Sequence, residues 1–346
     1  MRIASSVPPE ALRLAATSIA RALDVANREM STGRHADLGL ALGAQLGRPV
    51  EARVERVRLD AFESSDALVN TRLSATQASL GGLRAGADSL REALIAAKAA
   101  PQQRAGLVDV ARAFLNDIVA TMGRDVAGAA LFGGRNLQAP ILADYDPTRA
   151  TGPAATLQAA FVGAFGFDQD DAAVSTITAP ALNAFLAGSF DALFQPAGWS
   201  ADWSSATDAT TTVEIAPGRA IANSLSANDP SFALMTKAAT MVADLGAEKL
   251  SGQAFEALAD AALQAISRAS AGIEAIEAQV GVAQNQMAKA QEAMRTLRAS
   301  LDLQIGADEG VDAFEAATRV NELRTRLETT YALTARLRGL SLLNYL

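Results

Sequence analysis

The chain has 346 residues, of which 50% are hydrophobic and only 5% are aromatic, and its formal net charge is -8. The apolar content excludes wholesale disorder, and the scarcity of aromatic residues favours slender helix bundles with cores of alanine, leucine and valine. The negative charge and the lack of any basic run argue against a nucleic-acid backbone or an anionic membrane as the partner.

The sequence contains no cysteine, which excludes disulfide bonds and thiolate chemistry. No stretch reaches the roughly 18 apolar residues expected of a membrane span. The first ten residues contain two prolines and a glutamate where a secretory leader needs an apolar core. These features predict a protein that is either cytosolic or exported by a route without a cleaved leader.

The first predicted helix runs from Pro9 to about Thr32, and Gly33 is placed to end it. Apolar side chains recur along this helix in steps of four and three, which is the spacing of a coiled-coil seam. Three glycines and Pro49 then indicate a loop or a broken helical stretch. The residues of the N-terminal seam are Leu12, Ala16, Ile19, Leu23, Ala26 and Met30.

A second long helix follows and ends before Pro101. A third helix is predicted from about Ala105 to Met122, because its apolar residues again share one face. The seam of the second helix consists of Val69, Leu73, Thr76, Leu80, Leu83, Ala87, Leu90 and Leu94.

Between Phe132 and Asn228 the helical periodicity fades, and prolines and glycines break the chain repeatedly. The β-branched run Thr210–Ile215 predicts a short strand that turns at Pro217–Gly218. One helix is predicted from about Ala179 to Phe194. We interpret this segment as an inserted α+β domain, and its lack of heptads predicts that it is dispensable for assembly.

Helix returns at Ser231 and leads into the longest seam of the chain. A helix of that length, roughly 60 Å at about 1.5 Å per residue, must lie against another long helix, and the helix at 69–97 is its expected antiparallel partner. A terminal helix follows Gly310. The longest seam consists of Ala262, Ile266, Ala269, Ile273, Ile276, Val280, Ala283, Met287, Ala290, Met294, Leu297 and Leu301, and the terminal seam of Ala316, Val320, Leu323, Leu327, Thr330, Thr334 and Leu337.

The two terminal seams are narrow apolar stripes on otherwise polar helices, so we expect them to pair with each other. A pair of helices that shares a single stripe is marginal on its own, and the outer faces still carry Leu14, Leu333 and Leu340. Packing between neighbouring subunits would bury that surface. The predicted assembly interface consists of Leu12, Ile19, Leu23, Met30, Val320, Leu323, Leu327, Leu337, Leu340 and Leu343.

No pattern in the chain predicts catalysis, a cofactor or a metal. His35 is the only histidine and has no cysteine beside it, so the imidazole is expected to be a loop residue after the first helix. Asp170 and Asp171 could supply a carboxylate pair for glycoside chemistry, but adjacent acids in a breaker-rich segment favour solvated loop charge.

Two further features also favour structural roles. Gly133-Gly134-Arg135 lacks the spacing of a phosphate-binding loop, and a tight turn that needs positive φ is the expected use of these glycines. Trp199 and Trp203 could stack on a sugar, but they are expected to anchor the inserted domain because that segment has few other aromatic residues.

Four segments of the chain resemble one known family. Met30–Arg34 resembles the L-S-T-G-x-R stretch near the N-terminus of bacterial flagellins, and Leu131–Gly134 resembles their Y-L-F-G-G/S-G segment. Phe314–Glu328 and Leu340–Leu346 resemble the end of the flagellar hook-associated protein 3 family. The resemblance covers about 1–140 and 225–346. The nearly apolar run Ala36–Gly43 departs from the polar run that flagellins have there, which favours a junction protein over the main filament subunits.

The resemblance implies a structural subunit at the hook–filament junction of the bacterial flagellum, not an enzyme. Its partners would be other copies of itself in a ring, hook-associated protein 1, flagellin and an export chaperone, and it would leave the cell through the flagellar type III channel. A minor flagellin is the alternative within this class, and a cytosolic coiled-coil adaptor is the alternative outside it. An enzyme in the middle domain is a third possibility.

The expected fold is mainly α: an elongated, nested helical hairpin with a small inserted α+β domain. Residues 1–45 and 310–346 are expected to form a terminal coiled-coil assembly domain. Residues 46–139 and 229–309 form a helical rod, and residues 140–228 form the insert.

Overall fold

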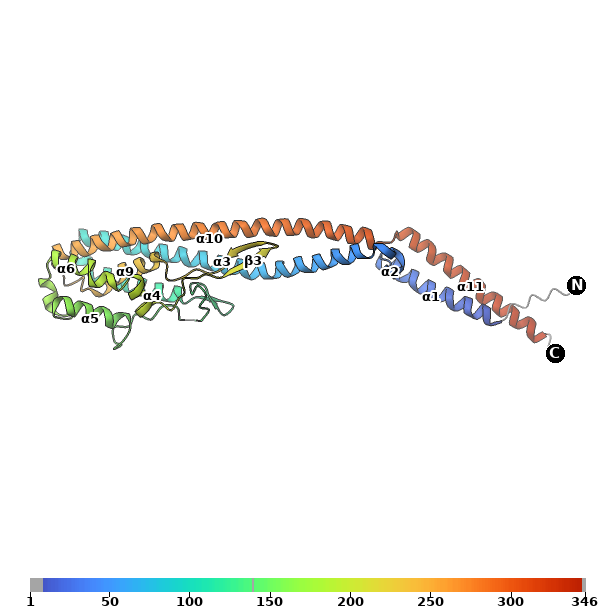
Figure 1. Cartoon of the computed structure of the whole chain (residues 1–346), viewed down its shortest axis with the longest axis horizontal. Helices are drawn as coiled ribbons and strands as arrows, with labels where there is room; N and C mark the ends of the chain where they lie inside the picture. The colour runs from blue at the N-terminus through green and yellow to red at the C-terminus, as the bar shows by residue number, and fades with distance from the viewer. Residues whose placement is uncertain (1–8, 139, 344–346) are drawn as a thin grey trace. The chain divides into compact units, whose positions relative to one another are not determined.

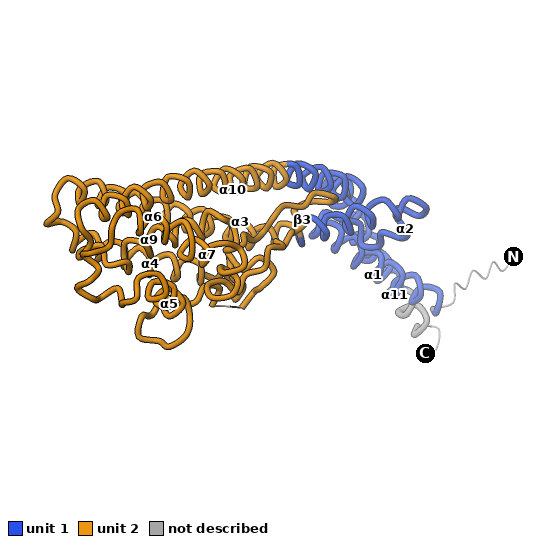
Figure 2. Tube along the Cα trace, turned by 60° about the vertical axis from the view of Figure 1, so that its left-hand side comes forward, with its two compact units in different colours: residues 1–61, 293–346 blue, residues 62–292 orange. Residues whose placement is uncertain are grey.

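The computed structural model describes residues 9–138 and 140–343, and the side chains of residues 10–138 and 140–336. Most of the described residues are helical, and the strands form two small antiparallel sheets of two strands each, which confirms the predicted mainly-α fold. The chain divides into two compact units (Figure 2). Unit 1 consists of residues 1–61 and 293–346, and unit 2 of residues 62–292.

In unit 1, helix α1 (Pro9–Thr32) has the predicted bounds and ends at Gly33, which has a φ of +66°. The expected broken stretch is the short helix α2 (Leu38–Leu42) followed by a 3-10 turn, η1 (Gly43–Gln45). The terminal helix α11 (Ala313–Leu343) lies beside α1 in the opposite direction (Figure 1).

Two long helices, α3 (Gly47–Ala99) and α10 (Gly252–Glu309), run antiparallel to each other, as the seams predicted. Residue numbers fall along α10 as they rise along α3 in the ion pairs that join them. In unit 1 these pairs are Arg56–Asp302 and Asp60–Arg298, and in unit 2 they are Arg84–Glu277 and Lys98–Asp260.

The predicted seam on α10 is buried or half-buried from Ala262 to Met294 and is wrong at Leu297, whose side chain is 44% exposed. Further along the helix, Ile305 is buried instead. A straight helix drifts by about 20° per heptad relative to strict four-and-three spacing. After many heptads that drift turns Leu297 away from the partner helix. A step of four residues from Leu301 to Ile305, in place of a step of three, places an apolar side chain on the buried face again.

Helices α4 (Arg104–Met122) and α9 (Pro230–Asp244) of unit 2 pack against each other. A 3-10 turn, η2 (Pro101–Gln103), joins α3 to α4. Gly86 lets α3 approach α4 closely, because a Cβ at this position would lie 2.4 Å from the ring of Phe114. Buried residues lie on every side of α9, so this helix is covered all round.

The inserted segment contains the predicted strand as β3 (Thr212–Ala216), and it turns at Gly218 into β4 (Arg219–Ala222). The prediction of a single helix was wrong. Gly188 divides the expected helix into α6 (Ala179–Ala187) and α7 (Ser189–Ala192). Helix α5 (Pro153–Phe165) was missed because its apolar residues are not confined to one face. The other elements of the insert are η3 (Ala172–Thr176), α8 (Pro196–Gly198) and the π-helical turn η4 (Trp199–Trp203). Before the insert, β1 (Asp125–Val126) and β2 (Ala129–Ala130) form a short antiparallel pair.

Trp199 and Trp203 anchor the insert, as expected. Both are buried, and their rings stack with centroids 5.5 Å apart. The indole N–H of Trp199 donates a hydrogen bond to the backbone oxygen of Ala227, 3.1 Å away. Neighbouring rings continue this contact from Trp203 to Phe194 and from there to Phe190. These aromatic residues belong to one core with the buried faces of α3, α4, α9 and α10 in unit 2.

Asp66 is an acidic residue at a seam position of α3, seven residues before Leu73. Its side chain is fully buried, and neither carboxyl oxygen has a hydrogen-bond partner among the described residues. Burial raises the pKa of Asp66 from 3.8 to about 6. The folded chain therefore holds this proton to a higher pH than the unfolded chain does. A stability penalty appears as the pH rises from about 4 to about 6 and persists above that range.

We therefore expect Asp66→Leu to stabilise the protein at pH 7.5 by about 1–3 kcal/mol, since it removes an unpartnered polar group from the core. The gain should shrink as the pH falls towards 4, where the wild-type carboxyl is protonated in both states. Urea unfolding at several pH values measures this effect. Asp109→Leu, an exposed site on α4, is the control for the change in net charge. A loss of stability in Asp66→Leu, or a gain independent of pH, would contradict the expectation.

Candidate assembly surface

The candidate site is the pair formed by α1 and α11 in unit 1. Ala26 is 1% exposed and Ala316 is also buried, so small residues allow the two helices to approach closely along the predicted stripe. The structure thus brings the N-terminal and C-terminal seams together within one chain. Of the predicted interface residues, Leu12, Ile19, Leu23, Val320, Leu323 and Leu327 are half-buried and Met30 is exposed. Leu337, Leu340 and Leu343 lie in the last turns of α11, and their side chains fall outside the described residues.

The outer faces of this pair remain apolar in places. Leu14 and Val25 on α1, and Tyr331 and Leu333 on α11, are exposed. Single exposed apolar residues are common, but here they lie on a pair of helices whose own contact is one narrow stripe. A partner that covers these faces would stabilise the pair.

A second exposed stripe lies on α3 in unit 1. Val50, Val54 and Val57 follow one another in steps of four and three, and all three are exposed. On α10, Leu303 is exposed as well. Sequence reasoning missed this stripe, although the spacing of the valines was the available signal. It gives unit 1 a further apolar surface outside the α1–α11 pair.

Glu29, near the end of α1, is buried and holds the loop that follows the helix. Its carboxylate accepts a hydrogen bond from the backbone N–H of Ala36 at 3.1 Å and one from Arg319 on α11 at 3.4 Å. The Nδ1 atom of His35 lies 3.7 Å from the same carboxylate. His35 is therefore a loop residue, as predicted, and it lies beside a structural acid.

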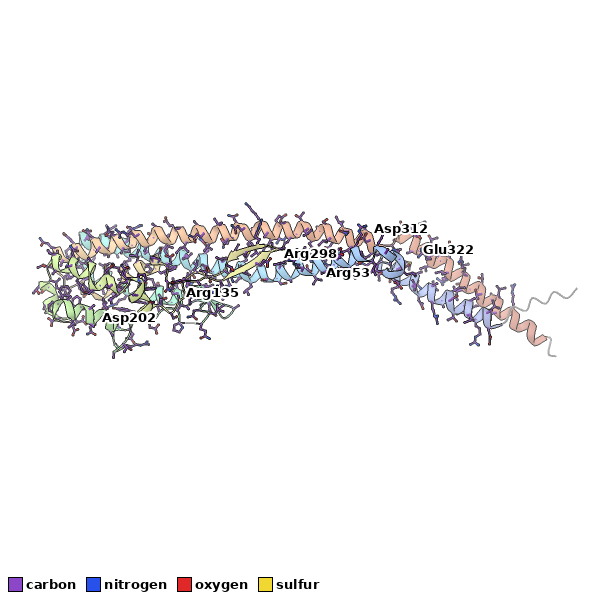
Figure 3. The ribbon with its side chains drawn as sticks, in the orientation of Figure 1. Arg53, Arg135, Asp202, Arg298, Asp312 and Glu322 are labelled. Carbon is purple, nitrogen blue, oxygen red and sulfur yellow. The ribbon has the colours of Figure 1, made fainter. Side chains whose placement is uncertain are left out.

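Glu309, the last residue of α10, has a side chain that is only 1% exposed. One carboxylate oxygen accepts hydrogen bonds from Arg53 at 2.6 Å and from Arg34 at 3.4 Å. The backbone pairs alongside it: the N–H of His35 donates to the oxygen of Glu309, and that of Val311 donates to the oxygen of Gly33. The two connecting segments, 33–35 and 309–311, therefore form a short antiparallel bridge. Arg53, whose guanidinium binds Glu309, is labelled in Figure 3.

Neither buried glutamate could be identified from the sequence. Each is an ordinary charged residue at the end of a long helix, and its burial depends on arginines that are far away in the chain. Glu309 and Arg34, for example, are 275 positions apart. The Coulomb attraction of two arginines offsets the cost of burying Glu309, and only the tertiary structure shows that arrangement.

The other residues considered for chemistry have structural positions. Asp170 is fully exposed, and Asp171 caps η3 by accepting a hydrogen bond from the N–H of Ala173. Gly134 has a φ of +63°, and a Cβ there would lie 2.1 Å from the backbone oxygen of Thr207, which confirms the predicted turn. In the described residues, no three histidine, aspartate or glutamate side chains are grouped to hold a metal ion. No described helix is long and apolar enough to cross a membrane.

Comparisons with known proteins match both ends of the chain to one family. Residues 3–138 match the N-terminal helical region of bacterial flagellin, and residues 263–346 match its C-terminal helical region. The chain belongs to the bacterial flagellin family. It is therefore a structural subunit of the bacterial flagellum, an extracellular appendage, and the family's helical ends imply that it polymerises with other copies of itself.

A solved structure shows a similar fold. It is described provisionally as a flagellar hook-associated protein from Vibrio parahaemolyticus, and it is 15% identical to this flagellin-family chain. The match covers 77% of this chain and 97% of the other, with a TM-score of 0.54. No curated protein sequence is significantly similar to the chain.

The single stripe between α1 and α11 leads to an expected result for the isolated subunit. Limited proteolysis of a monomer should trim residues near 10–40 and 310–336 before it cuts between 50 and 300, because the terminal pair has the smaller core. Mass spectrometry of the fragments identifies the cuts. Equal protection of the terminal helices and of unit 2, in a sample shown to be monomeric, would contradict this expectation.

Proposed function

We propose that this chain is a hook-associated subunit at the hook–filament junction, where it forms a ring and connects the hook to the flagellin filament. The apolar outer faces of the α1–α11 pair, exposed in the single chain, are the observation that carries the proposal, because they call for neighbouring subunits. The C-terminal sequence motif and the fold shared with a hook-associated protein favour the junction over the filament.

Each part of the chain has a role in this proposal. Residues 1–45 and 310–346 form the assembly domain, which lines the inside of the assembled tube. Residues 46–139 and 229–309 form a rod in the layer around it, and residues 140–228 project outward from that layer. Hook-associated protein 1 and flagellin are the proposed neighbours on the two sides. Export takes place through the flagellar type III channel with the help of a chaperone, and the subunit has no catalytic role.

Removal of the gene tests this function directly. The expected result is that cells carry hooks without filaments and release flagellin into the medium, and that the wild-type gene restores filaments. Electron microscopy of sheared appendages and immunodetection of flagellin measure both effects. Filaments of normal number and length in the deletion strain would overturn the junction role.

The position of the subunit distinguishes the junction protein from a minor flagellin. Gold-labelled antibodies against the chain should bind once per flagellum, at the base of the filament. Labelling along the whole filament would identify a filament subunit, and labelling confined to the cytosol would identify the coiled-coil adaptor.

A further inference from the structure

Unit 1 contains a groove of about 580 Å³ that runs along α1, α2 and α11. Its apolar lining includes Leu40, which is 86% exposed and therefore has little cover within its own chain. Helix α2 holds this leucine over the groove, because Asp37 caps the helix by accepting a hydrogen bond from the N–H of Leu40 at 3.0 Å. Arg21, Ala22, Val25, Leu323 and Arg326 also line the groove.

The charged residues of the lining are mostly engaged within the chain. Glu29 binds Arg319 at 3.4 Å, and Glu322 lies 3.9 Å from Arg326 (Figure 3 labels Glu322). Arg21 has no acidic partner among the described residues, so its guanidinium remains available. The groove therefore combines an apolar lining with a free cation at its edge, and these properties suit an aromatic side chain that has acidic neighbours.

The chain itself carries such a side chain. Phe314, in the first turn of α11, is 83% exposed. Asp312 caps this helix by accepting hydrogen bonds from the backbone N–H groups of Phe314 and Glu315, so one acid precedes the ring and another follows it (Figure 3 labels Asp312). Aromatic side chains, phenylalanine included, are enriched at protein–protein interfaces, so an exposed phenylalanine on a capped helix is suited to anchor one.

Phe314 cannot fill the groove of its own chain. Leu323, which lines the groove, lies nine residues further along the same helix. At about 100° per residue, nine residues place the two side chains on opposite sides of α11 and roughly 13 Å apart along its axis. The ring and the groove can therefore meet only between two copies.

We propose that Phe314 of one copy inserts into the groove of the next copy, where Asp312 or Glu315 pairs with Arg21. This inference rests on the proposed function, since it specifies the contact by which the subunit assembles. The two surfaces in this contact are different, so the contact does not close into a symmetric dimer. Repetition of such a contact yields a ring or a helix of subunits.

Cross-linking tests the contact, because the natural chain has no cysteine to interfere. Ala313→Cys places a thiol beside Phe314, Ala22→Cys places one in the groove, and both changes leave the proposed contact residues intact. Flagella sheared from cells that produce the double variant are oxidised and analysed on denaturing gels. The expected result is a ladder of covalent oligomers, whereas each single variant stays monomeric.

A second measurement uses substitutions of the ring itself. Phe314→Asp should lower the amount of the chain in sheared flagella by about tenfold or more, whereas Phe314→Leu should largely restore it. Circular dichroism of the purified variants should equal that of the wild type, because the residue is exposed. Leu40→Asp, in the groove, should match the effect of Phe314→Asp.

The outcomes separate this contact from the proposed function. If the wild-type chain is present in flagella but the double variant gives no ladder, or Phe314→Asp is incorporated normally, the contact is overturned and the proposed function remains. Dimers from either single variant would indicate a symmetric contact and also overturn the inference. Absence of the wild-type chain from flagella would overturn both.

Discussion

Replacing Ala26 with aspartate is expected to separate α1 from α11 and to abolish assembly. Ala26 is 1% exposed and lies in the stripe that faces α11. A carboxylate there would be buried in the contact between the two helices, at a cost of several kcal/mol. A pair of helices that shares one stripe cannot absorb that cost, because short helices in water depend on their packing.

The measurements are the helical signal in circular dichroism, which should fall, and the amount of the chain in sheared flagella, which should drop below detection. Thermal unfolding of unit 2 should be unchanged, since its core contains no part of α1. Asn27→Asp is the matched control, because it adds the same charge at the next residue, which is exposed. If Ala26→Asp keeps the full helical signal and still assembles, the α1–α11 stripe is not what holds the site together.

Deleting residues 140–228 is expected to unfold much of unit 2. This outcome is the opposite of what the breaker-rich sequence predicted. Backbone hydrogen bonds join the segment to the residues before it: Leu225 donates to Leu131 at 3.0 Å, and Ala227 donates to Phe132 at 2.7 Å. The insert also supplies Asp191 as the ion-pair partner of the half-buried Lys237 on α9.

The expected effect is large because aromatic residues of the insert pack into the common core. Removing one buried phenylalanine or tryptophan costs about 3–5 kcal/mol, and a domain is typically stable by only about 5–15 kcal/mol. Without the insert, α9 would lose its cover on one side and expose an apolar surface. The deleted protein should be insoluble, or should bind a hydrophobic dye and lose its cooperative thermal transition.

A small deletion in the same segment serves as the control. Residues 148–150 lie in an exposed loop, and their removal should leave the thermal transition within a few degrees of the wild type. If the large deletion yields a soluble protein with a cooperative transition, the rod folds without the insert and this expectation is wrong.

The long helices could be predicted from the sequence because the spacing of apolar residues that indicates a helix repeats many times along each of them. Each seam repeats its spacing over several heptads, so an error at one residue does not change the assignment, and α1 and α4 begin and end close to the predicted positions. The strand at 212–216 was predicted because β-branched residues precede a turn-forming Pro217–Gly218 pair.

Features that depend on tertiary contacts could not be predicted. Helix α5 carries apolar residues on most of its surface, so it has no distinct face by which to recognise it. The groove of unit 1 is built from α1 and α2 near one end of the chain and α11 near the other, and the exposure of Phe314 is a property of the folded surface. The terminal seams were predicted from their own residues, whereas the surface beyond them required the structure.

The bridge between segments 33–35 and 309–311 has a mechanical consequence. A single extended strand between two helices can swivel about its backbone bonds and carries little torque. Here two strands run side by side and are joined by hydrogen bonds, with the Glu309 carboxylate clamped against them by Arg34 and Arg53. Rotation at this joint must shear those bonds together, so twisting is resisted by both strands and a pull along the chain is shared between them.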